Sequence, residues 1–63
     1  MIRLKKRCLN EDRAHFLQDR VERFRDVFVC YCNPCILGYE LEVYLEDDYS
    51  ETTIEKLEDL GFR

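Results

Sequence analysis

Residues on which most enzymes depend are scarce in this chain. Its 63 residues include two glycines, one proline, one histidine and no tryptophan. Two glycines are too few for the glycine-rich loop that cradles phosphates, and the spacing places no nucleophile near the only histidine, His15. We interpret His15 as a solvated surface residue, so the sequence predicts a protein without catalytic activity.

Long apolar segments are missing as well. No hydrophobic run approaches the ~18 residues that a membrane-spanning helix needs. Residues 1–7 lack the apolar stretch and the cleavage site of a signal peptide. We therefore expect one cytoplasmic domain, residues 1–63, without a membrane partner. A core this small would gain stability from a metal, a disulfide or a partner chain.

Charge is abundant and unevenly placed. The net charge is −4, yet residues 1–25 carry eight basic and four acidic side chains, whereas residues 26–63 carry two basic and ten acidic ones. The ends of a short chain lie close together, so we expect the two parts to neutralise one another. The alternative is a dipolar surface that steers a charged partner. Few amide residues among many ionic ones are typical of proteins from hot environments.

The first part of the chain predicts a strand and a helix. Apolar and basic residues alternate from Ile2 onward, which indicates a short strand with Ile2 and Leu4 facing inward. Asn10 is a favourable N-cap for a helix over about residues 11–25. The apolar stripe of this helix consists of Ala14, Leu17, Val21 and Phe24.

Two strands follow in the middle of the chain. Residues 27–32 are β-branched, aromatic or sulfur-containing, which indicates a strand. Asn33 and Pro34 then predict a turn. Strict alternation over residues 39–46 indicates a strand with one buried and one solvated face.

A second helix is predicted near the end of the sequence. Asp47, Asp48 and Ser50 mark its start, and Thr52 with Glu55 suggests a capping box. Gly61 stands where a left-handed residue ends a helix, which would let Phe62 fold back onto the last turn.

The predicted order β-α-β-β-α corresponds to a single small α+β domain. A right-handed crossover makes the first two strands parallel, and a short connection makes the last two antiparallel. A ladder of opposite charges favours the strand order 1-3-2, with both helices on the other face. This ladder would set Arg3, Lys5 and Arg7 opposite Glu40, Glu42 and Glu46. The topology resembles a ferredoxin-like unit that lacks its last strand, and no family motif accompanies it.

Four cysteines are candidates for a metal site or a disulfide. Cys32 and Cys35 have the C-x-x-C spacing of a zinc knuckle, to which Cys30 or Cys8 could add thiolates. Alternation is expected to place Cys30 and Cys32 on the solvated face and Cys8 on the core face, which opposes a single tetrahedral site. Free thiols, zinc and a disulfide all stay open. Dithiol redox chemistry is disfavoured because no helix follows the motif.

A basic and aromatic stripe on the first helix is a candidate binding surface. Its members are Arg13, Phe16, Arg20 and Arg23. Such a stripe can hold phosphate or carboxylate groups and stack on a base, and Lys5, Lys6 and Arg7 would extend it into a nucleic-acid-binding module. Net negative charge opposes that function. The simpler interpretation is that Phe16 shields a sheet edge beneath the arginine stems.

The solvated face of the sheet is the second candidate surface. We expect Phe28, Cys30, Cys32 and Tyr44 there; if strand 2 is flipped, Val27, Val29 and Tyr31 face outward instead. An apolar patch and an uncovered edge strand are both typical of interfaces. We therefore expect a small interaction or regulatory protein that docks on a larger protein or forms a homodimer through strand 2 or this face. Nucleic-acid binding, and metal or thiol chemistry at the cysteines, are the alternatives.

Overall fold

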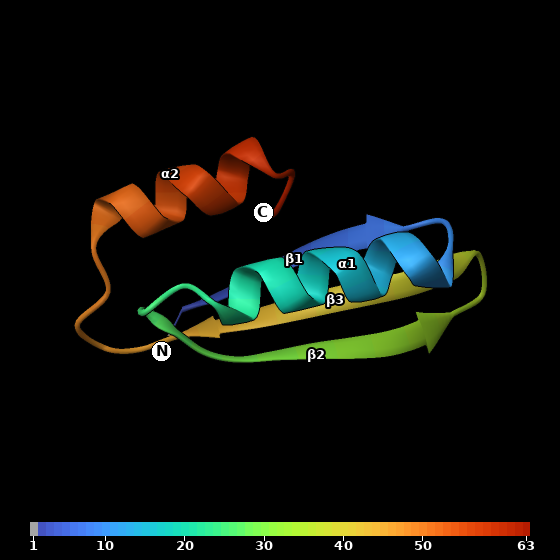
Figure 1. Ribbon diagram of the computed structural model, residues 1–63, viewed down its shortest axis with the longest axis horizontal. Helices are drawn as coiled ribbons and strands as arrows, with labels where there is room; N and C mark the ends of the chain where they lie inside the picture. Colours follow the sequence, from blue (N-terminus) through green and yellow to red (C-terminus); the bar gives the residue numbers. More distant parts are fainter. Residues whose placement is uncertain (1) are drawn as a thin grey trace.

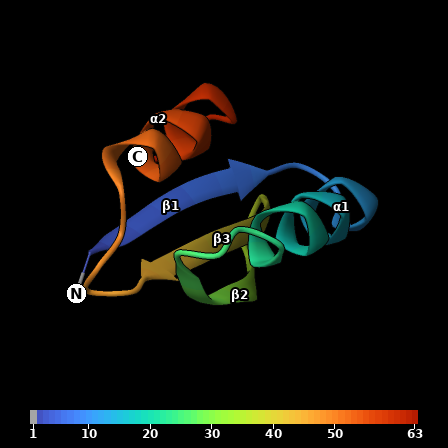
Figure 2. The ribbon, with the colours of Figure 1, turned by 60° about the vertical axis from the view of Figure 1, so that its left-hand side comes forward.

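The computed structural model describes residues 2–63 as three strands and two helices. They are β1 (Arg3–Cys8), α1 (Glu11–Glu22), β2 (Val27–Cys35), β3 (Gly38–Leu45) and α2 (Glu51–Asp59). The strands form an open sheet in the order β1-β3-β2, with β3 antiparallel to both neighbours. Helix α1 runs along the strands over one face of the sheet, and α2 lies beside β1 (Figures 1 and 2). The predicted fold class and strand order are confirmed.

Strand β3 supplies the centre of the core. Its residues Leu41, Val43 and Leu45 are fully buried and alternate with partly exposed residues, as the pattern predicted. Both helices pack on this face, because α1 contributes Leu17 and α2 contributes Leu57 to the same cluster. The other face of the sheet carries no helix.

The charge ladder forms on this uncovered face, with one change. The Arg3 guanidinium lies 3.9 Å from the Glu42 carboxylate, and the Lys5 ammonium lies 3.8 Å from the Glu40 carboxylate. Arg7 stands directly opposite Glu40. Glu46 follows the end of β3 and has no place in the ladder, which corrects that part of the prediction.

Strand β2 is longer than predicted. It runs through Asn33 and Pro34, so the predicted turn there is wrong, and Cys35 instead pairs with Gly38 across a two-residue turn. Pro34 is tolerated because the alternation of the strand directs its backbone nitrogen to the outer edge of the sheet. No neighbouring strand there requires a hydrogen bond from this nitrogen. Gly38 has φ +143°, and a Cβ atom there would collide with the Cys8 carbonyl oxygen, so this turn requires glycine.

A bulge between Val27 and Val29 reverses the predicted faces of β2. Cys30 is 2 % exposed on the core face and Cys32 packs against the core, so their predicted place on the solvated face is wrong. The flipped alternative holds for Val29 and Tyr31, which pair with Tyr44 and Glu42 on the open face. It fails for Val27, which packs on the core, because the extra residue of a bulge changes the alternation.

Each helix begins after a residue whose side chain caps its first turn. The Asn10 side chain accepts a hydrogen bond from the Arg13 amide at 2.7 Å, which confirms the predicted N-cap of α1. The N-cap of α2 is Ser50, whose hydroxyl accepts from the Thr53 amide at 3.4 Å, and the predicted box of Thr52 with Glu55 is wrong.

The C-terminal end of α2 follows the prediction closely. Gly61 has φ +100° and its amide donates to the Glu58 carbonyl at 2.9 Å. The Phe62 amide donates to the Leu57 carbonyl at 2.9 Å, which completes a Schellman motif. This reversal carries the Phe62 ring into the core, where it is fully buried.

Both edges of the sheet are partly closed. At the outer edge of β1, Lys5 and Arg63 exchange two backbone hydrogen bonds of 2.7 and 2.8 Å. At the outer edge of β2, the Gln18 side chain donates to the Cys30 carbonyl at 2.8 Å, and Pro34 has no amide hydrogen to offer. Such devices limit strand addition by another chain.

Candidate functional site

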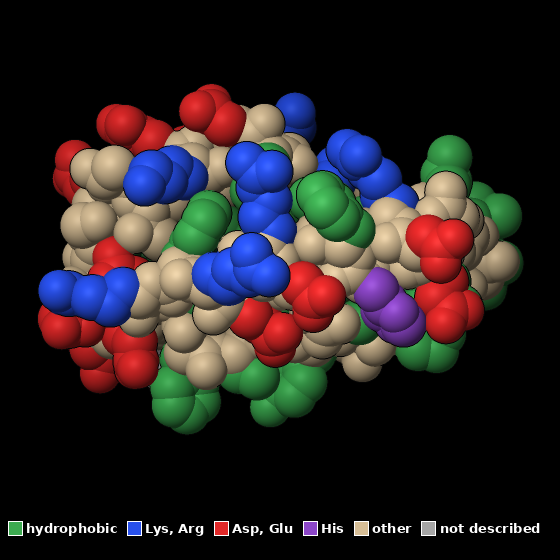
Figure 3. Space-filling model, viewed as in Figure 1, with side chains coloured by type: hydrophobic (Ala, Val, Ile, Leu, Met, Phe, Trp, Pro, Cys, Tyr) green, Lys and Arg blue, Asp and Glu red, His purple; other side chains and the backbone are tan. Residues whose placement is uncertain are grey.

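Three adjoining hollows form a groove along α1 and the turn that follows it, and two of them also border α2. Phe24 borders all three, and the hollow nearest the start of α2 encloses about 480 Å³. We call this feature the basic groove and define it by Phe16, Arg20, Arg23, Phe24 and Lys56. In the space-filling view, Lys and Arg side chains surround hydrophobic ones over this region (Figure 3).

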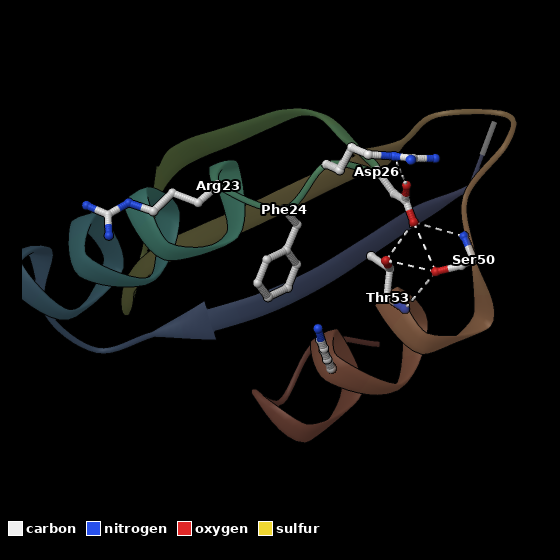
Figure 4. A pocket seen from close by; sticks show the side chains of 7 residues that line it. Arg23, Phe24, Asp26, Ser50 and Thr53 are labelled. Atoms are coloured by element: carbon white, nitrogen blue, oxygen red, sulfur yellow. Dashed lines mark hydrogen bonds and ion pairs between the residues drawn. The ribbon is translucent and has the colours of Figure 1, made fainter.

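Phe24 forms the centre of the groove. Helix α1 ends at Glu22, and the Phe24 amide still donates to the Val21 carbonyl at 3.0 Å, which turns the ring toward α2 (Figure 4). One side of the ring packs against the core. The Lys56 ammonium lies 5.9 Å from the ring centroid, within the range of a cation–π interaction. The groove therefore has an apolar floor with a cation directly beside it.

The cations of the groove outnumber its carboxylates. In the described part of the chain, no ion pair engages Arg20, Arg23 or Lys56. Two carboxylates, of Asp19 and Asp59, also line the groove without forming such a pair. The arrangement leaves three cationic groups free to hold an anionic ligand beside an aromatic surface.

One wall of the groove is held by a buried carboxylate that the sequence analysis missed. The Asp26 carboxylate accepts hydrogen bonds from the Thr53 hydroxyl at 2.6 Å, the Ser50 amide at 2.9 Å and the Ser50 hydroxyl at 3.1 Å (Figure 4). Arg25 lies 3.5 Å from its other oxygen. The bond from Thr53, with those from Ser50, lowers the pKa of Asp26 below 3.8.

This network ties the start of α2 to the start of β2. Asp26 is 6 % exposed and stands 24 residues before Ser50, so only the tertiary fold brings the two together. The one local signal was Ser50 itself, which caps α2 with the hydroxyl that also donates to Asp26. The consequence for the site is a fixed distance between the walls of the groove.

The predicted binding residues divide between separate surfaces. Phe16, Arg20 and Arg23 come together in the basic groove, with Phe24 and Lys56 added by the structure. Arg13 lies apart from them, beside Lys6, Arg7 and Leu9 near the start of α1. The basic residues therefore do not form one continuous tract.

The open face of the sheet carries the remaining predicted aromatic residues. The rings of Tyr44 and Tyr31 meet edge to face, with centroids 5.8 Å apart. Tyr31 is 52 % exposed, and Phe28 is 60 % exposed at the bulge. The open face thus combines an aromatic pair from β2 and β3 with the ion-paired ladder on β1 and β3.

The cysteines do not form the predicted constellation. Cys8, Cys30 and Cys32 share the core side of the sheet, so the expected separation of Cys8 from Cys30 by face is wrong. Burial raises the pKa of the Cys30 thiol to about 12, which keeps it protonated and unreactive. Cys8, Cys30, Cys32 and Cys35 are all free thiols.

The C-x-x-C spacing also lacks the geometry of a knuckle. Cys32 and Cys35 lie within one extended strand, where three residues span about 10 Å. A disulfide needs Cα atoms closer than roughly 7 Å. Among residues 2–63, no group of three or more His, Cys, Asp or Glu side chains is placed to hold a metal ion.

Neither helix of the described chain is long and apolar enough to cross a membrane. The longer one, α1, has 12 residues, and its exposed side carries charged and polar side chains. Comparison of the chain with protein-family models, with curated proteins and with solved structures finds no match.

Proposed function

We propose that this protein is a small, non-catalytic interaction protein that docks on a larger protein through the open face of its sheet. The observation that carries the proposal is the exposure of Tyr31, whose ring meets that of Tyr44 on a face that neither described helix covers. Large aromatic side chains are enriched at the centres of protein interfaces, where their burial supplies much of the binding free energy.

The sheet edges are weaker candidates than the face. The Gln18 side chain donates a hydrogen bond to the Cys30 carbonyl on β2, and the Arg63 backbone exchanges two hydrogen bonds with the Lys5 backbone on β1. A strand added at either edge would have to displace these hydrogen bonds. Docking on the open face leaves all of them intact.

Charge on the open face favours a different protein over a second copy. Two copies stacked about a two-fold axis through the central strand would place β3 over β3. Glu40 and Glu42 would then oppose their own counterparts, and like charges directly opposite are destabilising. Arg3 and Lys5 already pair with these glutamates. The partner therefore needs to supply apolar surface rather than charge.

Crosslinking from the face tests the proposal. Tyr31 is replaced by the photoreactive analogue p-benzoylphenylalanine in the cell of origin, with the same analogue at the exposed Glu55 of α2 as the matched control. We expect one larger protein to crosslink from position 31 and not from position 55. Equal capture from both positions would refute the proposal. Crosslinks to the protein itself, with a dimer in sedimentation, would replace it with self-association.

A further inference from the structure

We infer that the basic groove binds an extended, acidic segment of the partner protein. This inference rests on the proposed docking function and adds to it a second contact surface, next to α2. The juxtaposition that carries it is three unpaired cations arranged around the half-buried ring of Phe24.

The shape of the groove suits an extended ligand. The three hollows all border Phe24, and each pair of them shares a further cationic side chain, so they surround the Phe24 ring. Together they reach from Phe16 of α1 to Ser50 at the start of α2. A single small anion would occupy only one of the hollows.

The charge of the groove calls for an anionic ligand. The chain carries a net charge of −4, yet Arg20, Arg23 and Lys56 gather here, and none of them forms an ion pair in the described residues. They outnumber the carboxylates of Asp19 and Asp59, which line the same groove. Carboxylates of a bound segment would form charge-assisted hydrogen bonds with these groups. Apolar side chains between the carboxylates would pack on the rings of Phe16, which is 58 % exposed, and Phe24.

Two features favour a peptide over a single-stranded nucleic acid. The carboxylates of Asp19 and Asp59 line the same groove, and they would repel a backbone that carries a phosphate at every unit. A peptide can place apolar residues at those points. The basic side chains that would lengthen a nucleic-acid track also lie elsewhere, because Arg13 is beside Arg7 and Lys5 is paired with Glu40.

The groove is built to keep its shape. The Asp26 network anchors the first turn of α2, and the buried Leu57 and Phe62 anchor its last turns to the core. Its walls therefore need little rearrangement on binding, which reduces the entropic cost of association.

Fluorescence anisotropy with defined probes tests the inference. The probes are a short labelled peptide of repeating Glu-Glu-Phe units, the matched peptide with lysine in place of glutamate, and oligouridylate. We expect only the acidic peptide to bind, with affinity that falls as salt rises. Lys56→Glu and Arg20→Glu should each weaken it about tenfold or more. Arg13→Glu, an exposed control on the same helix, should leave it unchanged.

The outcomes separate this inference from the proposed function. If the acidic peptide fails to bind while position 31 still crosslinks its partner, the groove inference is wrong and docking through the open face stands. Equal loss of binding in Arg13→Glu would also refute the groove, because the attraction would then be a general effect of charge. If oligouridylate binds and Lys56→Glu abolishes its binding, nucleic-acid binding replaces the acidic segment as the function of the groove, and crosslinking from position 31 still decides docking through the open face.

Discussion

Replacing Phe62 by alanine should cost most of the stability of this protein. The Phe62 side chain is fully buried and is among the largest buried side chains of the core. Replacing a buried phenylalanine by alanine typically costs ~3–5 kcal/mol. Domains are stabilised by about 0.05–0.15 kcal/mol per residue, which for 63 residues corresponds to about 3–9 kcal/mol in total. Phe62→Ala should therefore unfold at a much lower urea concentration than the wild-type protein.

Urea denaturation followed by circular dichroism measures this loss. Phe16→Ala serves as the matched control, because the Phe16 ring is 58 % exposed and its removal should cost about 0.5 kcal/mol or less. The backbone bonds from Phe62 to Leu57 remain available to alanine, so the difference between the two variants reports on the buried ring. Equal unfolding midpoints for the two variants would refute the conclusion that Phe62 completes the core.

Three further predictions concern stability. Gly61→Ala should cost about 1–2 kcal/mol, because alanine disfavours φ +100° and its Cβ would displace the Lys6 side chain; an unchanged melting temperature would contradict this. Glu42→Lys should destabilise by up to about 1 kcal/mol more than Glu58→Lys, since only Glu42 faces the β1 cations; equal thermal melts would remove the ladder as a source of stability. The lowered pKa of Asp26 means that its ionised form stabilises the fold fully above pH 3.8, and this contribution is lost as pH falls through the lowered pKa. Urea midpoints measured against pH should therefore show a loss on acidification that is smaller in Asp26→Asn, and identical profiles would contradict the network.

The sequence predicted those features that depend on neighbouring residues. Alternation over residues 39–46 identified a half-buried strand, because a strand with one buried face carries an apolar side chain at every second residue. Asn10, Ser50 and Gly61 identified helix ends, since each acts on backbone groups within one helical turn. Three of the groove residues, Phe16, Arg20 and Arg23, were recognised because they share one stripe of a single helix.

The missed features depend on contacts between distant segments. Nothing local marks the bulge after Val27, and one extra residue there reverses the face of every following side chain of β2. The predicted turn at Asn33 and Pro34 failed for a related reason, because pairing with β3 outweighs the turn preference of both residues. These two differences moved Cys30 and Cys32 into the core and placed Tyr31 on the open face.

The sequence by itself thus determined the order of the elements, the starts of both helices and the end of α2, because each follows from periodicity or from capping within a few residues. The central position of β3 followed from the opposite charges of the first and third strands. Only the tertiary structure decided which residues form the candidate site. Lys56 reaches Phe24 across 32 positions of sequence, and Asp26 reaches Thr53 across 27. Such contacts form only after the sheet and both helices have packed around the shared core, and no pattern within a single segment encodes them.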